Sequence, residues 1–159
     1  MSTIDDTIKS AGLACQLVRT SGNVNTYFYM SPKSARQSYD RDALMPTDSG
    51  VTNGDLIKYS NDYYLVIYLI EDRRIGQFLY VKARLFKCNY LVTIRDFNDT
   101  TKKFTDLSTN VPALIIDSAA TAMQTDRAIV VPGMGAQRDY SYYLYAQESA
   151  GINKNTTIY

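Results

Sequence analysis

The sequence predicts an all-β fold: a small β-barrel or sandwich with long loops and extended terminal arms. Three observations lead to this prediction. Short runs rich in β-branched and aromatic residues recur from Tyr27 to Tyr145, and turn residues bound each run. In the clearest run, apolar and basic residues alternate with a period of two, as on a strand with one buried face. No βαβ alternation is present, which argues against a parallel sheet.

The chain begins with a segment that has two interpretations. Ile4, Ile8 and Leu17 are spaced for one helical face, with Ser2 or Thr3 as an N-cap. Alternatively, "ACQLVR" is a strand that turns through "TSGNVN", where glycine and asparagine suit a turn, and returns as "TYFYM". We favour a short helix or arm followed by this hairpin.

A polar segment, Ser31–Asp55, follows the hairpin. It contains two prolines, two glycines and many polar residues. We interpret it as a long loop, with one helical turn near Lys33–Gln37. Loops of this length in a small domain are usually functional or disordered, and this one is expected to reach a neighbouring subunit.

The β signal is strongest after Gly54. The runs "DLIKY" and "YYLVIYLI" flank the polar turn "SND", and "EDRRIGQ" is the next polar break, with Glu71–Arg74 as a solvated hairpin tip. In "YVKARLFKC", one side of the expected strand carries Val81, Ala83, Leu85 and Lys87, and the other carries Lys82, Arg84, Phe86 and Cys88. The basic side is expected to face water, with its aliphatic stems covering apolar surface. "NYLVTIRDF" then leads through the turn "NDTTKK" back into "FTDLS".

The remainder contains three further short runs, "PALIID", "RAIVVPG" and "YSYYLYAQ". "SAATAMQTD" lies between the first two and is interpreted as a strand-loop or a single helical turn. The tail from Ala146 to Tyr159 is polar and predicts an extended C-terminal arm. We expect residues 1–159 to form a single β-domain.

Composition excludes several classes of function. The chain of 159 residues has 17 Lys and Arg against 16 Asp and Glu, so its charge offers no attraction for nucleic acid or an anionic membrane. No apolar run approaches the length that spans a bilayer. The start "MSTIDDTIKS" is unlike a secretory signal. We therefore expect no membrane partner.

No enzyme signature is present. The absence of histidine removes Ser-His-Asp and Cys-His pairs and nearly all zinc sites. "PGMGAQRD" holds a GxG without a third glycine or a following helix, and Asp117 and Asp126 have no visible partner. Lys87 beside Cys88 supplies positive charge but no base, so Cys88 is interpreted as a structural thiol. We expect no catalytic residue, cofactor or metal, and we expect Cys15 and Cys88 to be reduced and unpaired.

Tyrosine is the abundant aromatic residue, with 14 tyrosines and no tryptophan. A half-buried β surface is the favoured interpretation, a protein interface is the second, and base stacking is the third because a basic groove is missing. The loop and the tail carry sparse apolar anchors on polar chain, which suits segments that order on a partner. The candidate interface residues are Tyr39, Leu44, Met45, Ile152, Ile158 and Tyr159. The isolated protein is expected to be a monomer or a weak oligomer.

Four features of the chain form a pattern: Gly54–Asp55 before a strand, the Tyr63–Ile67 strand, the Arg84–Tyr90 segment that ends in "KCNY", and "RAIVVPG" at Arg127–Gly133. In these features the sequence resembles small virion proteins of the neck, or head-closure, group of tailed bacteriophages. The features cover roughly residues 50–135. The chain departs from the commoner pattern after "CNY", where it has Leu91–Ile94 as "LVTI".

The resemblance implies a β-barrel subunit of a closed ring, sixfold or twelvefold, at the head–tail junction of a virion assembled in the host cytoplasm. The implied partners are further copies of the chain, a portal or adaptor protein, and a tail or tail-terminator protein. DNA is implied only as cargo that passes through the channel, and the ring helps to retain it. Two alternatives stay open: another virion part, such as a tail-completion, tail-terminator or minor capsid protein, and a nucleic-acid-binding OB-like barrel.

Overall fold

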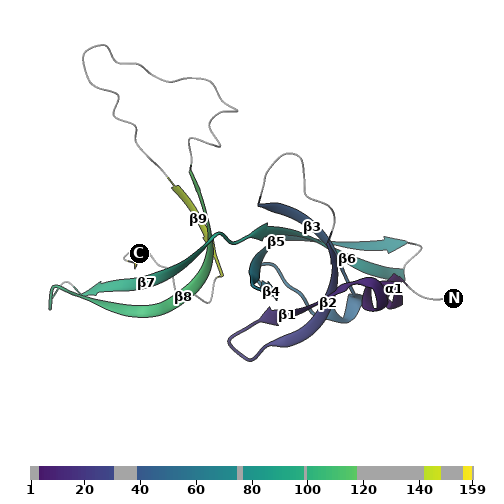
Figure 1. Cartoon of the computed structure of the whole chain (residues 1–159), viewed down its shortest axis with the longest axis horizontal. Coiled ribbons are helices and arrows are strands. Elements are labelled where there is room, and N and C mark those ends of the chain that lie inside the picture. Colours follow the sequence, from purple (N-terminus) through teal and green to yellow (C-terminus); the bar gives the residue numbers. More distant parts are fainter. Residues whose placement is uncertain are drawn as a thin grey trace, which may run out of the picture.

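The computed structural model of the chain describes residues 4–30, 39–74, 77–98, 100–117, 142–147 and 156–158. It confirms the predicted all-β class, because the described residues form strands almost throughout (Figure 1). The elements are α1 (Ile4–Ala11), β1 (Leu13–Val18), β2 (Val24–Met30), β3 (Asp40–Met45), the 3-10 turn η1 (Thr47–Ser49), β4 (Leu56–Tyr59), β5 (Asp62–Arg74), β6 (Gln77–Lys87), β7 (Tyr90–Asn98), β8 (Lys103–Asp117), β9 (Tyr142–Ala146) and β10 (Thr156–Ile158). Six strands close a barrel in the order β1-β2-β3-β6-β5-β4, and a second sheet has the order β10-β7-β8-β9.

Helix α1 confirms the first of the expected elements. Its one buried residue is Ile8, and the backbone N–H of Gly12 donates to the Ile8 carbonyl at 2.8 Å where the helix ends. A Cβ on Gly12 would lie 2.2 Å from that carbonyl oxygen, so only glycine permits the direct passage from helix to β1. Asp5 accepts a hydrogen bond from the Thr47 backbone N–H at 3.1 Å, which ties α1 to η1.

The two predicted hairpins of the barrel are both present. β1 pairs antiparallel with β2 from Leu13↔Phe28 to Leu17↔Val24, and the turn between them contains Gly22 at a φ of 121°. β4 pairs with β5 around Ser60, which adopts a φ of 55° in the expected polar turn. These turns form where the sequence places residues that tolerate positive φ or polar exposure.

The barrel interior is filled by one apolar cluster. Its buried members are Cys15, Leu17, Phe28, Ala43, Met45, Ile57, Tyr64, Val66, Val81, Ala83 and Leu85. The alternation predicted for β6 is confirmed, since Val81, Ala83 and Leu85 face the core while Lys82 and Arg84 are exposed. The ring of Phe28 contacts Tyr59 edge-on at a centroid distance of 5.4 Å.

The expectation of a long loop over Ser31–Asp55 is wrong for its second half. β3 lies there and pairs with β6 from Asp40↔Phe86 to Met45↔Val81, which closes the barrel. The strand was missed because its sequence, "DRDALM", is half charged, and its acidic residues are matched by basic residues on β6. The helical turn expected near residues 33–37 lies outside the described residues.

The interpretation of Glu71–Arg74 as a hairpin tip is also wrong. These residues are the last part of β5, and β6 begins at Gln77. The segment is polar because β5 and β6 extend past the barrel, where Glu71 and Arg73 are exposed. A polar strand that leaves the core lacks the apolar alternation by which strands are recognised.

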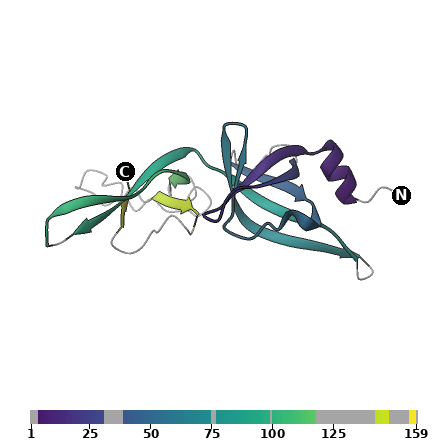
Figure 2. The same cartoon turned by 90° about the horizontal axis from the view of Figure 1, so that it is seen from below.

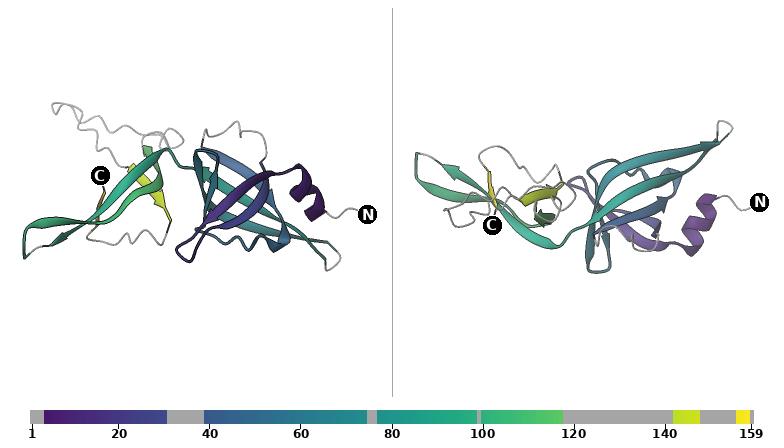
Figure 3. Two further views of the ribbon diagram at one scale, coloured as in Figure 1. Left: turned by 60° about the horizontal axis from the view of Figure 1, so that its bottom comes forward. Right: turned by 90° about the horizontal axis from the view of Figure 1, so that it is seen from above.

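Among the described residues, the second sheet has a smaller buried cluster than the barrel. Its buried cluster consists of Val92, Ile94 and Ala113, with partly buried apolar residues around it. The expected turn at its tip is present, since Asn98 Oδ1 accepts hydrogen bonds from the backbone N–H groups of Thr100 and Thr101, both at 3.0 Å. The pair β7–β8 runs away from the barrel along the long axis of the molecule, while α1 and the far end of the β5–β6 hairpin lie at the opposite end (Figures 2 and 3).

The C-terminal tail differs from the expected free arm. Ala146 is the last residue of β9, and Thr156–Ile158 pairs with Ile94–Asp96 on the outer side of β7. The chain therefore uses part of its tail to extend its own sheet. The sequence features "SAATAMQTD", "RAIVVPG" and "PGMGAQRD", together with Asp126, lie outside the described residues.

Candidate functional site

The outer surface of the barrel carries an aromatic and basic area that we call the barrel patch. It consists of Tyr27, Tyr29, Leu44, Tyr68, Ile70, Lys82 and Arg84. Its three tyrosines and its isoleucine are each 40 to 53% exposed, which is unusual for large apolar side chains that lie close together.

Strand register brings these side chains together from four strands. One row runs Tyr29↔Leu44 between β2 and β3, Leu44↔Lys82 between β3 and β6, and Lys82↔Ile70 between β6 and β5. In the next row, Arg84 of β6 lies opposite Tyr68 of β5. Residues directly opposite in an antiparallel pair share one face, so the rows form a continuous surface.

Acidic residues of β3 hold the basic residues of the barrel patch in place. Arg84 donates from Nε to Asp40 Oδ1 at 3.0 Å and forms a second bond to the other carboxylate oxygen. Asp40 is buried, while the Arg84 side chain is half exposed. Lys82 lies 3.7 Å from Asp42. The patch is therefore close to electrically neutral and suits a protein surface better than a nucleic acid.

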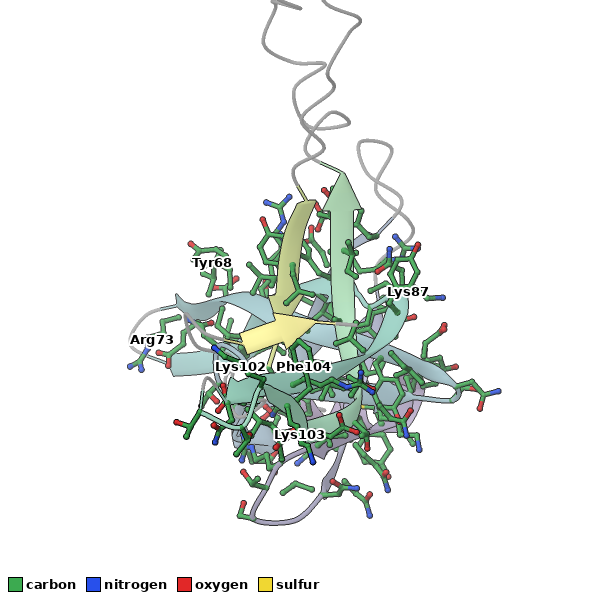
Figure 4. All side chains as sticks on the ribbon, turned by 90° about the vertical axis from the view of Figure 1, so that its left-hand side faces the viewer. Tyr68, Arg73, Lys87, Lys102, Lys103 and Phe104 are labelled. Carbon is green, nitrogen blue, oxygen red and sulfur yellow. The ribbon has the colours of Figure 1, made fainter. Side chains whose placement is uncertain are left out.

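A second exposed surface lies on β7 and the first part of β8, which we call the ribbon (Tyr90–Asn98 and Lys103–Pro112). Its exposed apolar residues are Tyr90, Leu91, Phe104 and Leu107. Arg95 bonds across the ribbon to Asp106 at 2.6 Å. In Figure 4, Lys102, Lys103 and Phe104 lie together toward the viewer, while Tyr68 and Arg73 project from one side of the molecule.

Barrel and sheet meet at a joint built from aromatic rings. Phe86 of β6 contacts Tyr39 at 5.2 Å and Tyr145 of β9 at 5.5 Å, both edge-on. Asn89, in the link between β6 and β7, ties that link to β8, because its side chain accepts from the Ile115 N–H at 2.9 Å and donates to the Ile115 carbonyl at 3.0 Å. A pocket of about 320 Å³ lies beside the joint, lined by Tyr39, Lys87, Cys88, Asn89, Leu114, Ile115 and Ile116.

Neither cysteine has the surroundings of a nucleophile. Burial raises the pKa of both Cys15 and Cys88 to about 12, and for Cys88 a backbone hydrogen bond from Leu65 opposes that rise. Both thiols are free in the structure and protonated at neutral pH. Lys87, whose charge was considered as an activator, instead bonds Asp62 at 2.7 Å.

A further partly buried ion pair joins Arg19, after β1, to Asp55, before β4. Arg19 donates from Nε to Asp55 Oδ1 at 3.1 Å, and the Thr52 N–H donates to the other carboxylate oxygen at 2.9 Å. Burial by itself raises the pKa of Asp55, but the bonds from Arg19 and Thr52 outweigh it and hold that pKa below its usual value. The pair closes the turn that leads into β4.

Of the six residues expected at an interface, the structure places the described ones in different parts of the fold. Leu44 lies in the middle of the barrel patch, half-buried between Tyr29 and Lys82. Tyr39 packs at the joint. The interpretation of Met45 as an interface anchor is wrong, because its side chain is buried in the barrel core. Ile158 pairs through its backbone with Ile94, while Ile152 and Tyr159 lie outside the described residues.

Sequence reasoning did not single out the exposed aromatic residues of the patch. Tyr27 and Tyr29 flank the buried Phe28, so the alternation in "TYFYM" was the signal that assigns them to the outer face. No comparable signal exists for Tyr68, because Ile67 is an extra residue at a register shift in β5 and changes which side chains face outward.

The chain matches no known protein family, no curated protein and no solved structure. Among the described residues, no group of three or more potential metal ligands lies close enough to hold an ion. The described part of the chain also contains no helix long and apolar enough to cross a membrane. Within the described residues, the barrel patch, the ribbon and the joint are therefore the candidate functional features.

Proposed function

We propose that this chain is a structural subunit of a tailed-bacteriophage virion that forms a ring at the head–tail junction. In this role it connects the portal or adaptor to the tail and helps to retain packaged DNA. It acts by contact and has no catalytic role. The resemblance of "GDLIKYSNDYYLVIYLIED" and "RLFKCNY" to the neck group supports this proposal, and the contact surfaces support it independently.

The observation that carries the proposal is the presence of two separate exposed apolar surfaces on one chain. The barrel patch presents Tyr29, Tyr68 and Ile70, and the ribbon presents Phe104 and Leu107. A subunit in a ring contacts one neighbour on each side through different surfaces, so it needs two. Rigid aromatic side chains with a polar tip are enriched at such interfaces.

Cryo-electron microscopy of virus particles purified from cells that express this chain tests the proposal. The expected result is a ring of barrels between the portal and the tail. Density elsewhere in the particle would assign the chain to another virion part, such as a tail-terminator or minor capsid protein. Purified particles that lack the chain would contradict the proposal altogether.

A deletion of Gly151–Tyr159 provides a second test. It removes β10 and leaves the barrel strands intact, so the barrel is expected to fold while incorporation into particles is impaired. Full incorporation with stable, DNA-filled and infectious particles would show that the tail is dispensable. Loss of barrel folding, measured by far-UV circular dichroism, would show that the tail belongs to the core.

A further inference from the structure

The barrel patch combines an exposed apolar surface with a balanced set of charges. Tyr29 and Tyr68 are each 53% exposed, and Ile70 is 43% exposed. Tyr68 projects from one side of the molecule (Figure 4). Large apolar side chains that are exposed together on one face mark a site that another protein covers. The charges around them indicate which protein that is.

The charges of the patch and of the strand end beside it cancel. Lys82 and Arg84 on β6 are the two basic groups of the patch, and they bond the two acidic groups of β3, Asp42 and Asp40. Beyond the patch, the end of β5 adds two acidic and two basic residues: Glu71, Asp72, Arg73 and Arg74. These residues together carry no net charge.

A surface without net charge can face a copy of itself. When two identical surfaces meet, a surface of one charge sign repels its copy, whereas a balanced surface does not. A strongly acidic or basic partner would gain no attraction from the same patch. The tyrosine hydroxyls of the patch also suit self-contact, because each of them both donates and accepts hydrogen bonds.

The two ion pairs of the patch differ in how firmly they are held within the chain. Asp40 is buried and accepts two hydrogen bonds from Arg84, so this pair stays within one copy. Lys82 and Asp42 lie 3.7 Å apart, and their side chains are 47% and 49% exposed. Exposed pairs of this kind contribute little stability and exchange partners at little cost. Lys82 and Asp42 are therefore the charged groups that remain available to a second copy.

We infer that, in the free protein, the barrel patch of one copy packs against the barrel patch of a second copy about a twofold axis. The exposed tyrosines and Ile70 form the apolar part of the contact, and Lys82 of each copy faces Asp42 of the other. Both copies use the same surface, so the contact closes at two chains. The patch is smaller than a standard interface, which has roughly 20–30 residues a side, so the dimer is weak and depends on protein concentration.

This dimer goes beyond the proposed function and does not depend on it. The patch is also one of the two contact surfaces of the proposed ring, so the dimer has to separate before a ring forms. Isolated protein tests the dimer, whereas virus particles test the ring, so each can fail without the other.

Exchange of the charges at positions 42 and 82 tests the contact in the purified full-length chain. Asp42→Lys makes basic groups face basic groups, and Lys82→Glu makes acidic groups face acidic groups. Each variant alone should dimerise at least tenfold more weakly than the wild type in sedimentation velocity. The double variant D42K/K82E and an equimolar mixture of the two single variants should both recover dimerisation, because opposite charges then face each other again.

The control for Asp42→Lys is the same substitution in an exposed ion pair outside the patch. Lys9 bonds Asp48 at 2.6 Å with side chains 41% and 65% exposed, so Asp48→Lys makes the same change of charge and should dimerise like the wild type. Circular dichroism of every variant checks that the barrel is folded. The inference is overturned by a wild type that stays monomeric at every concentration, by failure of the double variant or of the mixture to recover, or by equal losses for Asp42→Lys and Asp48→Lys.

A matched pair of apolar substitutions separates the patch from the ribbon. Ile70 on the patch and Leu107 on the ribbon are 43% and 48% exposed. Ile70→Ser should weaken dimerisation at least tenfold, whereas Leu107→Ser should leave it unchanged. Unchanged dimerisation of Ile70→Ser would overturn the inference, and so would an equal loss for Leu107→Ser, since that result would place the ribbon in the contact.

Discussion

The barrel and the second sheet differ in whether their strands close on themselves. Each is made of antiparallel strands, but the barrel closes on itself and buries a large cluster that includes Phe28, Met45 and Leu85. In the second sheet, β9 is paired with β8 only from Ala113 onward among the described residues, and the buried cluster around Ile94 is small. Closure satisfies backbone groups within the chain, whereas an open sheet leaves them for a partner. The barrel thus contains the larger described core, and the ribbon is one of the surfaces that the proposed function uses for contact.

The largest expected difference in the free energy of unfolding is between a phenylalanine-to-alanine substitution in the barrel core and one on the ribbon. Phe28→Ala removes a fully buried ring that packs against Tyr59 and Tyr64, and should lower the free energy of unfolding by about 3–5 kcal/mol. Phe104→Ala, on the exposed ribbon, should change it by less than about 0.5 kcal/mol. Urea unfolding measures both, and equal effects would refute the division into core and contact surface.

A second comparison concerns ion pairs. Asp55→Asn removes a buried carboxylate that accepts from Arg19 and Thr52, and should cost about 2 kcal/mol of unfolding free energy. Asp106→Asn breaks the exposed pair with Arg95 on the ribbon and should cost about 0–1 kcal/mol. Thermal or urea unfolding of the two variants checks this order. A larger loss for Asp106→Asn would mean that the ribbon is tied to the barrel more firmly than its exposure indicates.

The contribution of the Arg19–Asp55 pair to stability is expected to depend on pH. The folded-state pKa of Asp55 is lowered, so the stabilisation is fully present above its unfolded-state pKa of about 3.9 and is lost as pH falls through the folded value. The difference in stability between the wild type and Asp55→Asn should therefore be constant near neutral pH and shrink under acid conditions. Unfolding curves from about pH 7 down to about pH 3 measure it. A difference that grows on acidification would contradict the assigned sign.

The smallest expected effect is a difference in thiol accessibility. At pH 8 both cysteines should react slowly with iodoacetamide, since a pKa of about 12 leaves almost no thiolate. Cys88 lines the pocket at the joint, whereas Cys15 lies in the barrel core, so Cys88 should be labelled first. Mass spectrometry of partly labelled protein gives the order, and unfolded protein in urea is the control for maximal rate. Faster labelling of Cys15 would mean that the barrel opens before the joint does.

Local features of the chain could be predicted wherever neighbouring residues decide them. The hairpin between "ACQLVR" and "TYFYM" and the turn at Ser60 depend on glycine, asparagine and serine at the tight positions. The inward side of β6 depends on the alternation of Val81, Ala83 and Leu85 with basic residues. In each case the determining interactions lie within a few residues of one another, so composition and period are sufficient.

Strand β3 and the barrel patch could not be predicted in the same way. β3 is a strand because Asp40–Met45 pairs with β6, some forty residues later in the chain, and the charges of β3 are matched by Lys82 and Arg84. The patch exists because Tyr29, Leu44 and Ile70 come into register across neighbouring strands. Pairing between distant strands uses backbone groups that are the same in every residue, so it leaves no local pattern to read.

The sequence by itself determined the β class, the hairpins of the barrel and the absence of histidine-based chemistry, because propensity, turn chemistry and residue inventory are local properties. Only the tertiary structure decided that six strands close into a barrel, and that Met45 lies inside while Leu44 lies outside. Closure and exposure depend on how far each strand extends beyond its neighbour. That length is set by the packing of the whole barrel and not by any single segment.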